Sequence, residues 1–194
     1  RIMENIPADT MVLVDEAYAE FARPECSCEP LLSRYDNLVI LHTFSKAYRL
    51  AGVRLGYILA NAAVLDEFKK VRQPYSVDVV SQIIAEEVMR SRELFADGVA
   101  RIVASREELS AQLSAIDGVS VHPSDANYLL FYVEGAEDVW ERLYRDYSIL
   151  VRNVSADPLL PDCLRVTVCT PRENEKFVNA LKAILRERVD KAQD

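Results

Sequence analysis

Three short apolar runs near the start of the chain have the pattern of buried strands. TMVLV (10–14) and NLVILHT (37–43) are nearly continuous runs of Val, Ile and Leu, which is typical of strands covered on both faces of a parallel or mixed sheet. A third run, RLGYILA (54–60), follows closely. Between the first two runs, Pro24, Pro30 and a cysteine-rich middle predict a loop and then a short helix. The first part of the chain therefore has the pattern of an α/β sheet.

After residue 60 the apolar residues recur at spacings of three and four, with acidic and basic residues between them. This period is typical of helices that bury one face. Pro74 interrupts it. We therefore predict a short helix over 61–71, a turn that contains the proline, and one or two long helices over 77–116.

The last part of the chain mixes strand and helix patterns. Strands are predicted over 127–133, 149–154 and 163–169, a helix over 136–147, and a closing amphipathic helix from residue 171. This order predicts an antiparallel sheet covered by helices. We divide the chain into an α/β part (1–72), linking helices (73–116) and a small α+β domain (117–194).

Composition and charge exclude several classes of function. Among 194 residues, 23 Lys and Arg stand against 31 Asp and Glu, and the net charge of -8 has the wrong sign for a protein that neutralises nucleic-acid phosphates. No run approaches the roughly 18 apolar residues of a membrane span, and the first residues lack the apolar region of a signal peptide. We expect a cytoplasmic protein. The four cysteines form no C-x-x-C pair, so we expect neither a metal site nor a disulfide.

Candidate chemistry centres on Lys46, in the stretch HTFSKAYRLAGVRLGY (42–57) that ends the second strand. Most lysines after a strand are solvated surface residues. Near apolar side chains and hydroxyls, however, an amine can have a lowered pKa and attack a carbonyl group. Thr43 and Ser45 supply hydroxyls here, and Arg54 adds a planar cation that can hold a phosphate with two hydrogen bonds.

The segment DEAYAEF, at the end of the first strand, supplies an acid and a phenol. Asp15 follows four apolar residues, which places its carboxylate at the carboxyl edge of the sheet, where open α/β sheets bind ligands. A carboxylate there needs a partner, and a pyridinium nitrogen would serve. Tyr18 could bind another substituent of the same ring. An amine, an acid, a phenol and a phosphate cradle are the groups that pyridoxal phosphate requires.

Six segments, in order from about residue 10 to 185, resemble consecutive segments of the histidinol-phosphate aminotransferases. They are VLVDEAYAEF, TFSKAYRLAGVRLGYILA, VRQPYSV, HPSDANYLLF, ILVRNVS and CLRVTVCTPRENEKFVNAL. The first two are typical of class I and II aminotransferases, which are pyridoxal phosphate enzymes of fold type I. The later segments indicate the histidinol-phosphate branch.

The resemblance implies a role for each residue of the cofactor site. Lys46 would carry the cofactor covalently and then transfer the proton, Asp15 would pair with the ring nitrogen, and Tyr18 would bond the ring oxygen. Three further residues would hold the cofactor phosphate: Thr43, Ser45 and Arg54. His42 and His122 are interpreted as hydrogen-bonded residues at strand ends, because the lysine already serves as the proton shuttle.

The resemblance also implies substrates and a reaction. Arg152 and Arg165 match the arginines that grip the phosphate or carboxylate of the substrate. The partners would be a small anionic amino donor and a 2-oxo acid, in a homodimer. The implied reaction is L-histidinol phosphate with 2-oxoglutarate, giving imidazole-acetol phosphate and glutamate, in histidine biosynthesis.

The implied fold is part of a larger one. Residues 1–72 would form the C-terminal half of the cofactor-binding large domain, with a mixed, mostly parallel sheet and helices, and 117–194 the small α+β C-terminal domain. The family's glycine-containing phosphate loop, its ring-stacking aromatic and its N-P-x-N-P-T-G segment have no counterpart here, so we expect the C-terminal portion of such an enzyme. The alternatives are another class I/II aminotransferase with an aromatic donor, a threonine-phosphate decarboxylase-like enzyme, and an inactive fragment or non-catalytic binding relative.

Overall fold

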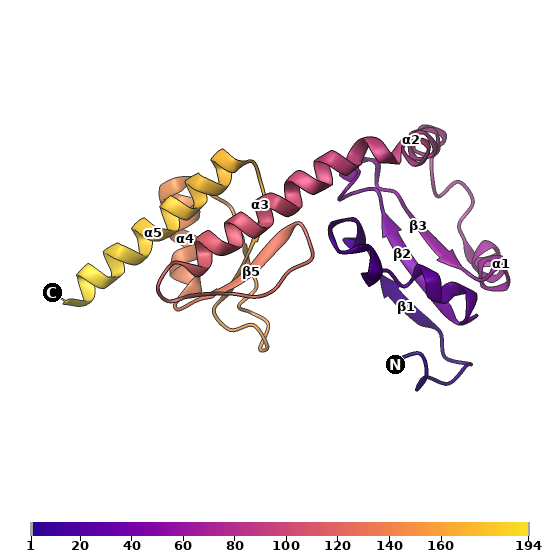
Figure 1. Cartoon of the computed structure of the whole chain (residues 1–194), viewed down its shortest axis with the longest axis horizontal. Coiled ribbons are helices and arrows are strands. Elements are labelled where there is room, and N and C mark those ends of the chain that lie inside the picture. The colour runs from indigo at the N-terminus through magenta and orange to yellow at the C-terminus, as the bar shows by residue number, and fades with distance from the viewer. Residues whose placement is uncertain (1, 194) are drawn as a thin grey trace. The chain divides into compact units, whose positions relative to one another are not determined.

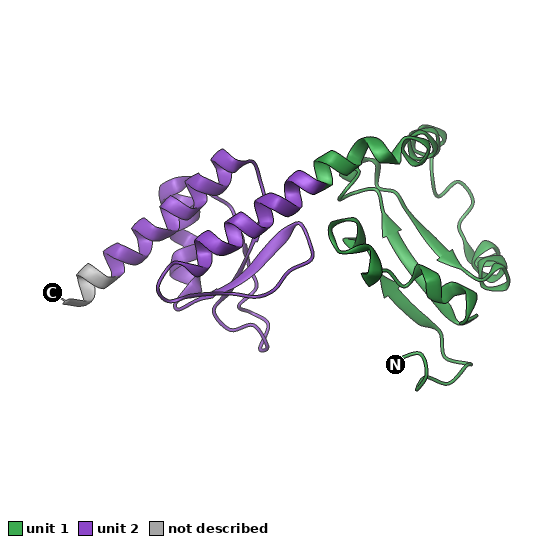
Figure 2. Ribbon diagram, viewed as in Figure 1, with its two compact units in different colours: residues 1–99 green, residues 100–194 purple. Residues whose placement is uncertain are grey.

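The computed structural model describes residues 2–193, with side chains to residue 188 (Figure 1). The chain divides into two compact units, residues 1–99 and 100–194 (Figure 2). Both mix strands with helices, so the predicted α/β class is confirmed. The finer division at residues 72 and 116 stays a prediction. No helix among the described residues is long and apolar enough to cross a membrane.

The first unit is built on a three-stranded sheet that follows the three apolar runs. Its strands, in the order β1-β2-β3, are β1 (Val12–Asp15), β2 (Leu38–Thr43) and β3 (Gly56–Ala60). β1 is parallel to β2, and β3 is antiparallel to it. Leu38, Val39 and Ile40 on the central strand are buried, in accordance with their continuous apolar pattern. The parallel register pairs Asp15 with Leu41, which brings the carboxyl ends of β1 and β2 to one edge.

The connection from β1 to β2 differs from the predicted loop and single helix. It contains three separate 3₁₀ turns: η1 (Ala19–Phe21), η2 (Pro24–Cys26) and η3 (Glu29–Ser33). Glu16 anchors this connection, because its buried carboxylate accepts hydrogen bonds from the Ser27 hydroxyl and the Cys28 amide. These bonds, which span 11 and 12 positions in the sequence, hold the connection in place without a longer helix.

Further helical elements complete the first unit, and two of them begin at side-chain caps. They are η4 (Ala51–Val53), α1 (Ala62–Val71), α2 (Val79–Arg90) and η5 (Arg92–Phe95), followed by α3 (Ala96–Ser114), which continues into the second unit. Asn61 caps α1 and Asp78 caps α2, each accepting a hydrogen bond from a free amide of the first turn. The predicted helix over 61–71 is confirmed, and the predicted long helices are two, separated by η5.

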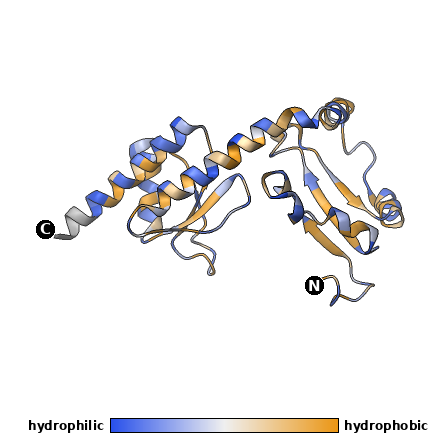
Figure 3. Cartoon of the chain, in the orientation of Figure 1, coloured by the Kyte–Doolittle hydropathy of each residue, from blue (hydrophilic) through white to orange (hydrophobic). Residues whose placement is uncertain are grey.

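The second unit is an antiparallel sheet in the order β4-β5-β7-β6, with α4 (Ala136–Tyr147) and α5 (Pro171–Gln193). The strands are β4 (Val119–Val121), β5 (Tyr128–Val133), β6 (Arg152–Asn153) and β7 (Cys163–Thr167). Alternate residues of β5, Leu129, Phe131 and Val133, are buried in a core shared with both helices. Figure 3 shows the apolar and polar residues alternating along these helices. The antiparallel sheet and both helices were predicted from the sequence.

The strand predicted over 149–154 is shorter than expected, since β6 contains two residues. Trp140 donates its indole N–H to the carbonyl oxygen of Val151 at 3.0 Å. That carbonyl is thereby bonded to a helix side chain rather than to a neighbouring strand. The side-chain bond explains why regular pairing begins only at Arg152.

Candidate functional site

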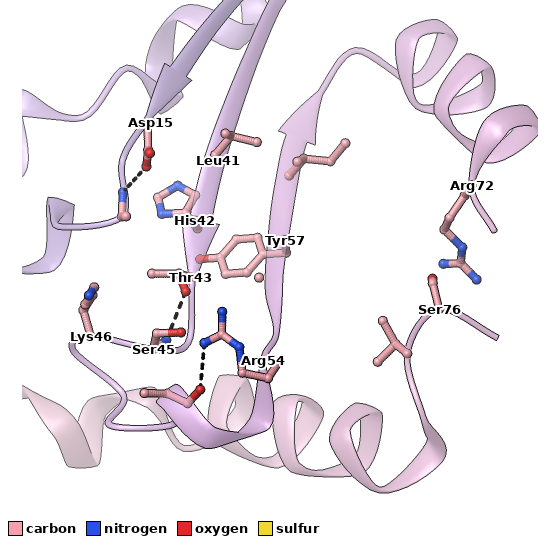
Figure 4. A pocket seen from close by; sticks show the side chains of 15 residues that line it. Asp15, Leu41, His42, Thr43, Ser45, Lys46, Arg54, Tyr57, Arg72 and Ser76 are labelled. Carbon is pink, nitrogen blue, oxygen red and sulfur yellow. Dashed lines mark hydrogen bonds between the residues drawn. The ribbon is translucent and has the colours of Figure 1, made fainter. Parts of the chain in front are cut away.

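Five of the predicted cofactor residues line one cavity of about 710 Å³ at the edge of the first sheet (Figure 4): Asp15, Thr43, Ser45, Lys46 and Arg54. Asp15 ends β1 and Thr43 ends β2, while Arg54 lies just before β3. Ser45 and Lys46 lie in the loop that follows β2. Residues separated by up to 39 positions in the sequence therefore meet at one edge of the sheet.

The loop after β2 is fixed by its own backbone and by the hydroxyl of Thr43. Thr43 Oγ1 accepts a hydrogen bond from the amide of Ser45 at 3.1 Å and reaches the Leu55 carbonyl at 3.4 Å. The Phe44 amide also donates to Leu55, and the Phe44 side chain is buried. The loop is held where it leaves β2, so Ser45 and Lys46 occupy defined positions at the cavity.

Gly56 allows the third strand to approach the second closely. A Cβ atom at this position would lie 2.6 Å from the carbonyl oxygen of His42 and 3.7 Å from the Cα atom of Thr43. The backbone of β2 leaves no room for a side chain here. Glycine therefore sets the spacing of the two strands where they border the cavity.

Arg54 has a backbone conformation that is rare for its residue type. Its φ is 56°, in the left-handed region, and it ends the 3₁₀ turn η4. Such strain at a non-glycine residue is found preferentially at functional sites. One guanidinium nitrogen donates to the carbonyl of Ala51 at 2.9 Å, and no carboxylate among the described residues forms an ion pair with Arg54. Its charge is available to an anion in the cavity.

Lys46 and Asp15 are likewise without an ion-pair partner in the part of the chain that the structure describes. The Lys46 amine lies 5.3 Å from the centre of the Tyr18 ring, a distance suited to a cation–π contact. One Asp15 oxygen accepts the amide hydrogen of Ala17 at 2.9 Å, which closes a local turn. Tyr18 therefore lies beside the lysine, although it is not among the residues that line the cavity, and its role stays a prediction.

A second layer contains Glu16, which the sequence analysis missed, and His42, which also lines the cavity. Successive strand residues point to opposite faces, so these two alternate with Asp15 and Thr43. His42 Nε2 lies 3.7 Å from a Glu16 oxygen, and its ring stacks on Tyr57 with centres 4.9 Å apart. The expectation that His42 is hydrogen-bonded is wrong, since neither ring nitrogen has a hydrogen-bond partner among the described residues.

Burial changes the acidity of the groups around this layer. Loss of solvation raises the pKa of the Tyr57 phenol to about 12, from an ordinary value of 10. Burial also raises the pKa of the Glu20 carboxyl, whose Oε2 has no hydrogen-bond partner. The sequence did contain a signal for this layer, because Glu16 and His42 are the polar chain neighbours of Asp15 and Thr43. Neighbouring residues of a strand point to opposite faces of the sheet.

The two predicted substrate arginines lie in the second unit and form a cavity of their own. Arg152 on β6 is directly opposite Arg165 on β7, and both line a space of about 360 Å³ with Trp140 and Thr167. The Arg165 guanidinium lies 4.9 Å from the centre of the Tyr128 ring. Neither arginine has a carboxylate partner among the described residues, so this cavity is suited to an anion.

The groups around Lys46 define what the first cavity can bind. An unpaired carboxylate suits a protonated ring nitrogen, and a guanidinium with two hydroxyls suits a phosphate. The primary amine at the same cavity can attack a carbonyl. Within the described residues, no group of three His, Cys, Asp or Glu side chains is arranged to hold a metal ion. The donor set therefore fits an aromatic, phosphorylated carbonyl compound.

Comparisons with known proteins identify relatives along nearly the whole chain. The family model described as aminotransferase class I and II matches residues 1–181. Histidinol-phosphate aminotransferase of Chlorobaculum tepidum is 39% identical over 95% of this chain and 52% of its own length. Histidinol-phosphate aminotransferase 1 of Carboxydothermus hydrogenoformans is 43% identical over 91% of this chain and 49% of its own. The chain thus spans about half the length of the curated relatives it matches.

Solved structures with the same fold include two kinds of enzyme. Histidinol-phosphate aminotransferase from Sinorhizobium meliloti, in complex with pyridoxal-5'-phosphate, is 26% identical with a TM-score of 0.84, over 95% of this chain and 51% of that one. L-threonine-O-3-phosphate decarboxylase from Porphyromonas gingivalis is 25% identical with a TM-score of 0.85, over 96% of this chain and 58% of that one.

Proposed function

Because the chain belongs to the class I and II aminotransferase family, we propose that it forms part of a pyridoxal-phosphate-dependent aminotransferase. The favoured reaction is transfer of the amino group of L-histidinol phosphate to 2-oxoglutarate, giving imidazole-acetol phosphate and glutamate in histidine biosynthesis. Relatives of that name at about 40% identity support this choice. The observation that carries the proposal is the meeting of Lys46, Asp15 and Arg54 at one cavity, each without an ion-pair partner among the described residues.

The donor set fits the cofactor in each of its parts. Asp15 would hold the ring nitrogen in its protonated form, and Tyr18 would bond the ring oxygen. The phosphate would be held by three residues: Thr43, Ser45 and Arg54. When bound, pyridoxal phosphate supplies an electron sink that stabilises negative charge at the substrate carbon next to the nitrogen. Arg54 already has its strained backbone in place, so part of the cost of ordering the phosphate site is met before binding.

Lys46 is the residue that moves the proton. Its amine is half-buried and rests against the Tyr18 ring, which restricts the side chain without neutralising it. A lysine held in this way can act first as a nucleophile and then as a base and an acid at the substrate carbon. Asp15 and Arg54 would orient the cofactor beside this amine, and neither takes part in the proton transfer.

Arg152 and Arg165 would bind the anionic end of the substrate. The donor carries a phosphate and the acceptor two carboxylates, so both half-reactions present an anion far from the reacting nitrogen. Two like charges directly opposite in a ladder repel each other, and an anion between them removes that cost. The guanidinium groups can bind it with paired hydrogen bonds.

The cofactor role is tested by incubating the chain with pyridoxal phosphate, reducing it with borohydride, and mapping the pyridoxylated peptide. We expect the label on Lys46 and its loss in Lys46→Ala. Lys70→Ala is the matched control, because Lys70 is an exposed lysine of α1 paired with Glu67. A label spread over surface lysines, or none at Lys46, would overturn the proposal and favour an inactive, non-catalytic relative.

The substrate is tested by adding amino donors to the protein incubated with pyridoxal phosphate but not reduced. We expect L-histidinol phosphate, rather than an aromatic amino acid, to give the aminated cofactor, and 2-oxoglutarate to reverse the change. The decarboxylase similarity makes L-threonine-O-3-phosphate the necessary comparison. Release of carbon dioxide from that compound, without amino transfer from L-histidinol phosphate, would refute the aminotransferase and favour a threonine-phosphate decarboxylase.

The proposal includes a cytoplasmic homodimer. Val79, Val80 and Ile83 on α2 are more than 60% exposed, and a second copy of the chain could cover this apolar surface. Light scattering of the wild type and of Val80→Lys tests the assembly, with a dimer expected for the first and a monomer for the second. A monomeric wild type at high concentration would contradict it. Cell fractionation tests the location.

A further inference from the structure

The arginine pocket of the second unit contains a contact that the sequence did not predict. Tyr128 begins β5 and pairs with Thr167 of β7, so its ring lies on the same face as Thr167 and as Arg165 two residues earlier. The Arg165 guanidinium carbon lies 4.9 Å from the centre of that ring. This distance is within the range of a cation–π interaction, in which the negative face of an aromatic ring attracts a cation.

Without this ring, Arg165 would have little to keep it in place. Arg152 is its direct cross-strand neighbour, and like charges at such positions repel. Both arginines are exposed, and neither has a carboxylate partner in the described part of the chain. A free arginine side chain also has several rotamers that it loses on binding. Repulsion and rotamer freedom both favour an Arg165 side chain that turns away from Arg152.

Tyr128 itself is well fixed. Its backbone belongs to the β5–β7 ladder, and its carbonyl oxygen accepts a hydrogen bond from the Ser124 hydroxyl at 2.6 Å. Val168 and Asn127 extend the pairing beyond the strand end, with 2.9 Å between the Val168 amide and the Asn127 carbonyl. The ring is half-buried and is not part of the cavity wall. Tyr128 therefore offers a rigid surface outside the space that an anion would occupy.

We propose that Tyr128 is a positioning residue that holds the Arg165 guanidinium beside Arg152 before an anion binds. The ring offsets the repulsion between the two arginines and restricts Arg165, so that less order is lost when the anion arrives. The aromatic face alone does this, and the phenol oxygen is not needed. The inference rests on the proposed function, because it assumes that Arg152 and Arg165 bind the anionic part of the substrate.

The test is an NMR titration of the full chain with inorganic phosphate, observed at the Nε–Hε signals of Arg165 and of Arg152, the second of which remains in variants that lack Arg165. A site-resolved signal is needed because the cavity around Arg54 can also bind phosphate. Tyr128→Leu should weaken phosphate binding at Arg165 by about two- to five-fold, the effect of one exposed cation–π contact. Tyr128→Phe should bind as the wild type does. Tyr144→Leu, which removes an exposed ring on α4, is the matched control and should leave the affinity unchanged.

The outcomes separate this inference from the proposed function. Loss of phosphate binding in Arg165→Gln, with wild-type affinity in Tyr128→Leu, would overturn the positioning role and leave the anion site intact. Unchanged binding in Arg165→Gln would overturn the anion site and the positioning role together. Loss of the dispersed β5–β7 amide signals in Tyr128→Leu would mean that this variant does not fold. Tyr128→Val, whose new residue has a high strand propensity, is then used instead, and the same weakening of phosphate binding is expected. Weaker binding in Tyr128→Phe, equal to that in the Leu variant, would assign the effect to the hydroxyl and refute the proposal.

Discussion

Replacing Gly56 with alanine should disrupt the edge of the sheet that carries the Lys46 loop. The new Cβ atom would lie 2.6 Å from the carbonyl oxygen of His42, where ordinary contacts begin near 3.4 Å. The obstacle is backbone at the end of the β2–β3 pairing, so the clash is not removed by rotation of a side chain. The strands must separate by several tenths of an ångström beside Thr43.

The cost follows from that geometry. Overpacking that forces a backbone shift destabilises a protein by about 1–3 kcal/mol. Because roughly 1.4 kcal/mol corresponds to a factor of ten in an equilibrium constant, the local opening of this ladder should become about five to a hundred and fifty times more frequent. Gly52→Ala is the matched control, since nothing lies within 4 Å of its Cβ position. That variant should be neutral or stabilised by up to about 1 kcal/mol through a less flexible unfolded chain.

Native-state hydrogen exchange of the β2 and β3 amides is the appropriate assay. The single tryptophan, Trp140, lies in the second unit and does not report directly on this sheet. Protection of the β2–β3 amides should fall in Gly56→Ala and stay unchanged or rise in Gly52→Ala. Equal protection in both variants would refute the argument that the close strand approach fixes the position of the loop.

Two further predictions concern single groups. The Tyr57 phenol holds its proton more tightly in the folded state, so its contribution to stability is complete below pH 10 and is lost as the pH rises toward about 12. Urea unfolding of wild type and Tyr57→Phe should therefore show a stability difference that changes over this window and is constant below it. Asn174→Ala removes two hydrogen bonds to the backbone of Cys169, of 2.9 and 3.2 Å, and should cost about 1–3 kcal/mol. Unfolding followed by Trp140 fluorescence checks this, and a change below about 0.5 kcal/mol would contradict it.

The regular elements could be predicted because their signals are local. The strands β1, β2 and β5 are continuous or alternating apolar runs, and α1 and α4 carry the helical period together with their end signals. The elements that were missed or shortened depend on partners far away in the sequence. β6 is cut short by an indole N–H eleven positions earlier, and the β1–β2 connection is fixed by the carboxylate of Glu16.

In the candidate site, too, some features could be predicted from the sequence and others depend on the fold. Residue types and a resemblance were enough to select Lys46, Asp15 and Arg54, because the chemistry of a cofactor limits which side chains can serve it. Nothing in that reasoning concerns the strained backbone of Arg54 or the ring of Tyr128 under Arg165, since both follow from turns and strand register. Motifs therefore selected the residues proposed to bind ligands, and geometry was needed to find the residue proposed to position one of them.

The alternation of side chains along a strand explains why Asp15 and Glu16 have different surroundings. A parallel register of β1 with β2 that presents Asp15 at the cavity edge necessarily turns Glu16 to the opposite face, next to His42. There its carboxylate is buried and bonded to Ser27 and Cys28, so a register slip of one residue would bury Asp15 without those partners. An unpartnered buried carboxylate is costly, and this penalty disfavours the slipped register. Glu16 and its hydrogen-bond partners thus help to determine which carboxylate faces the cavity.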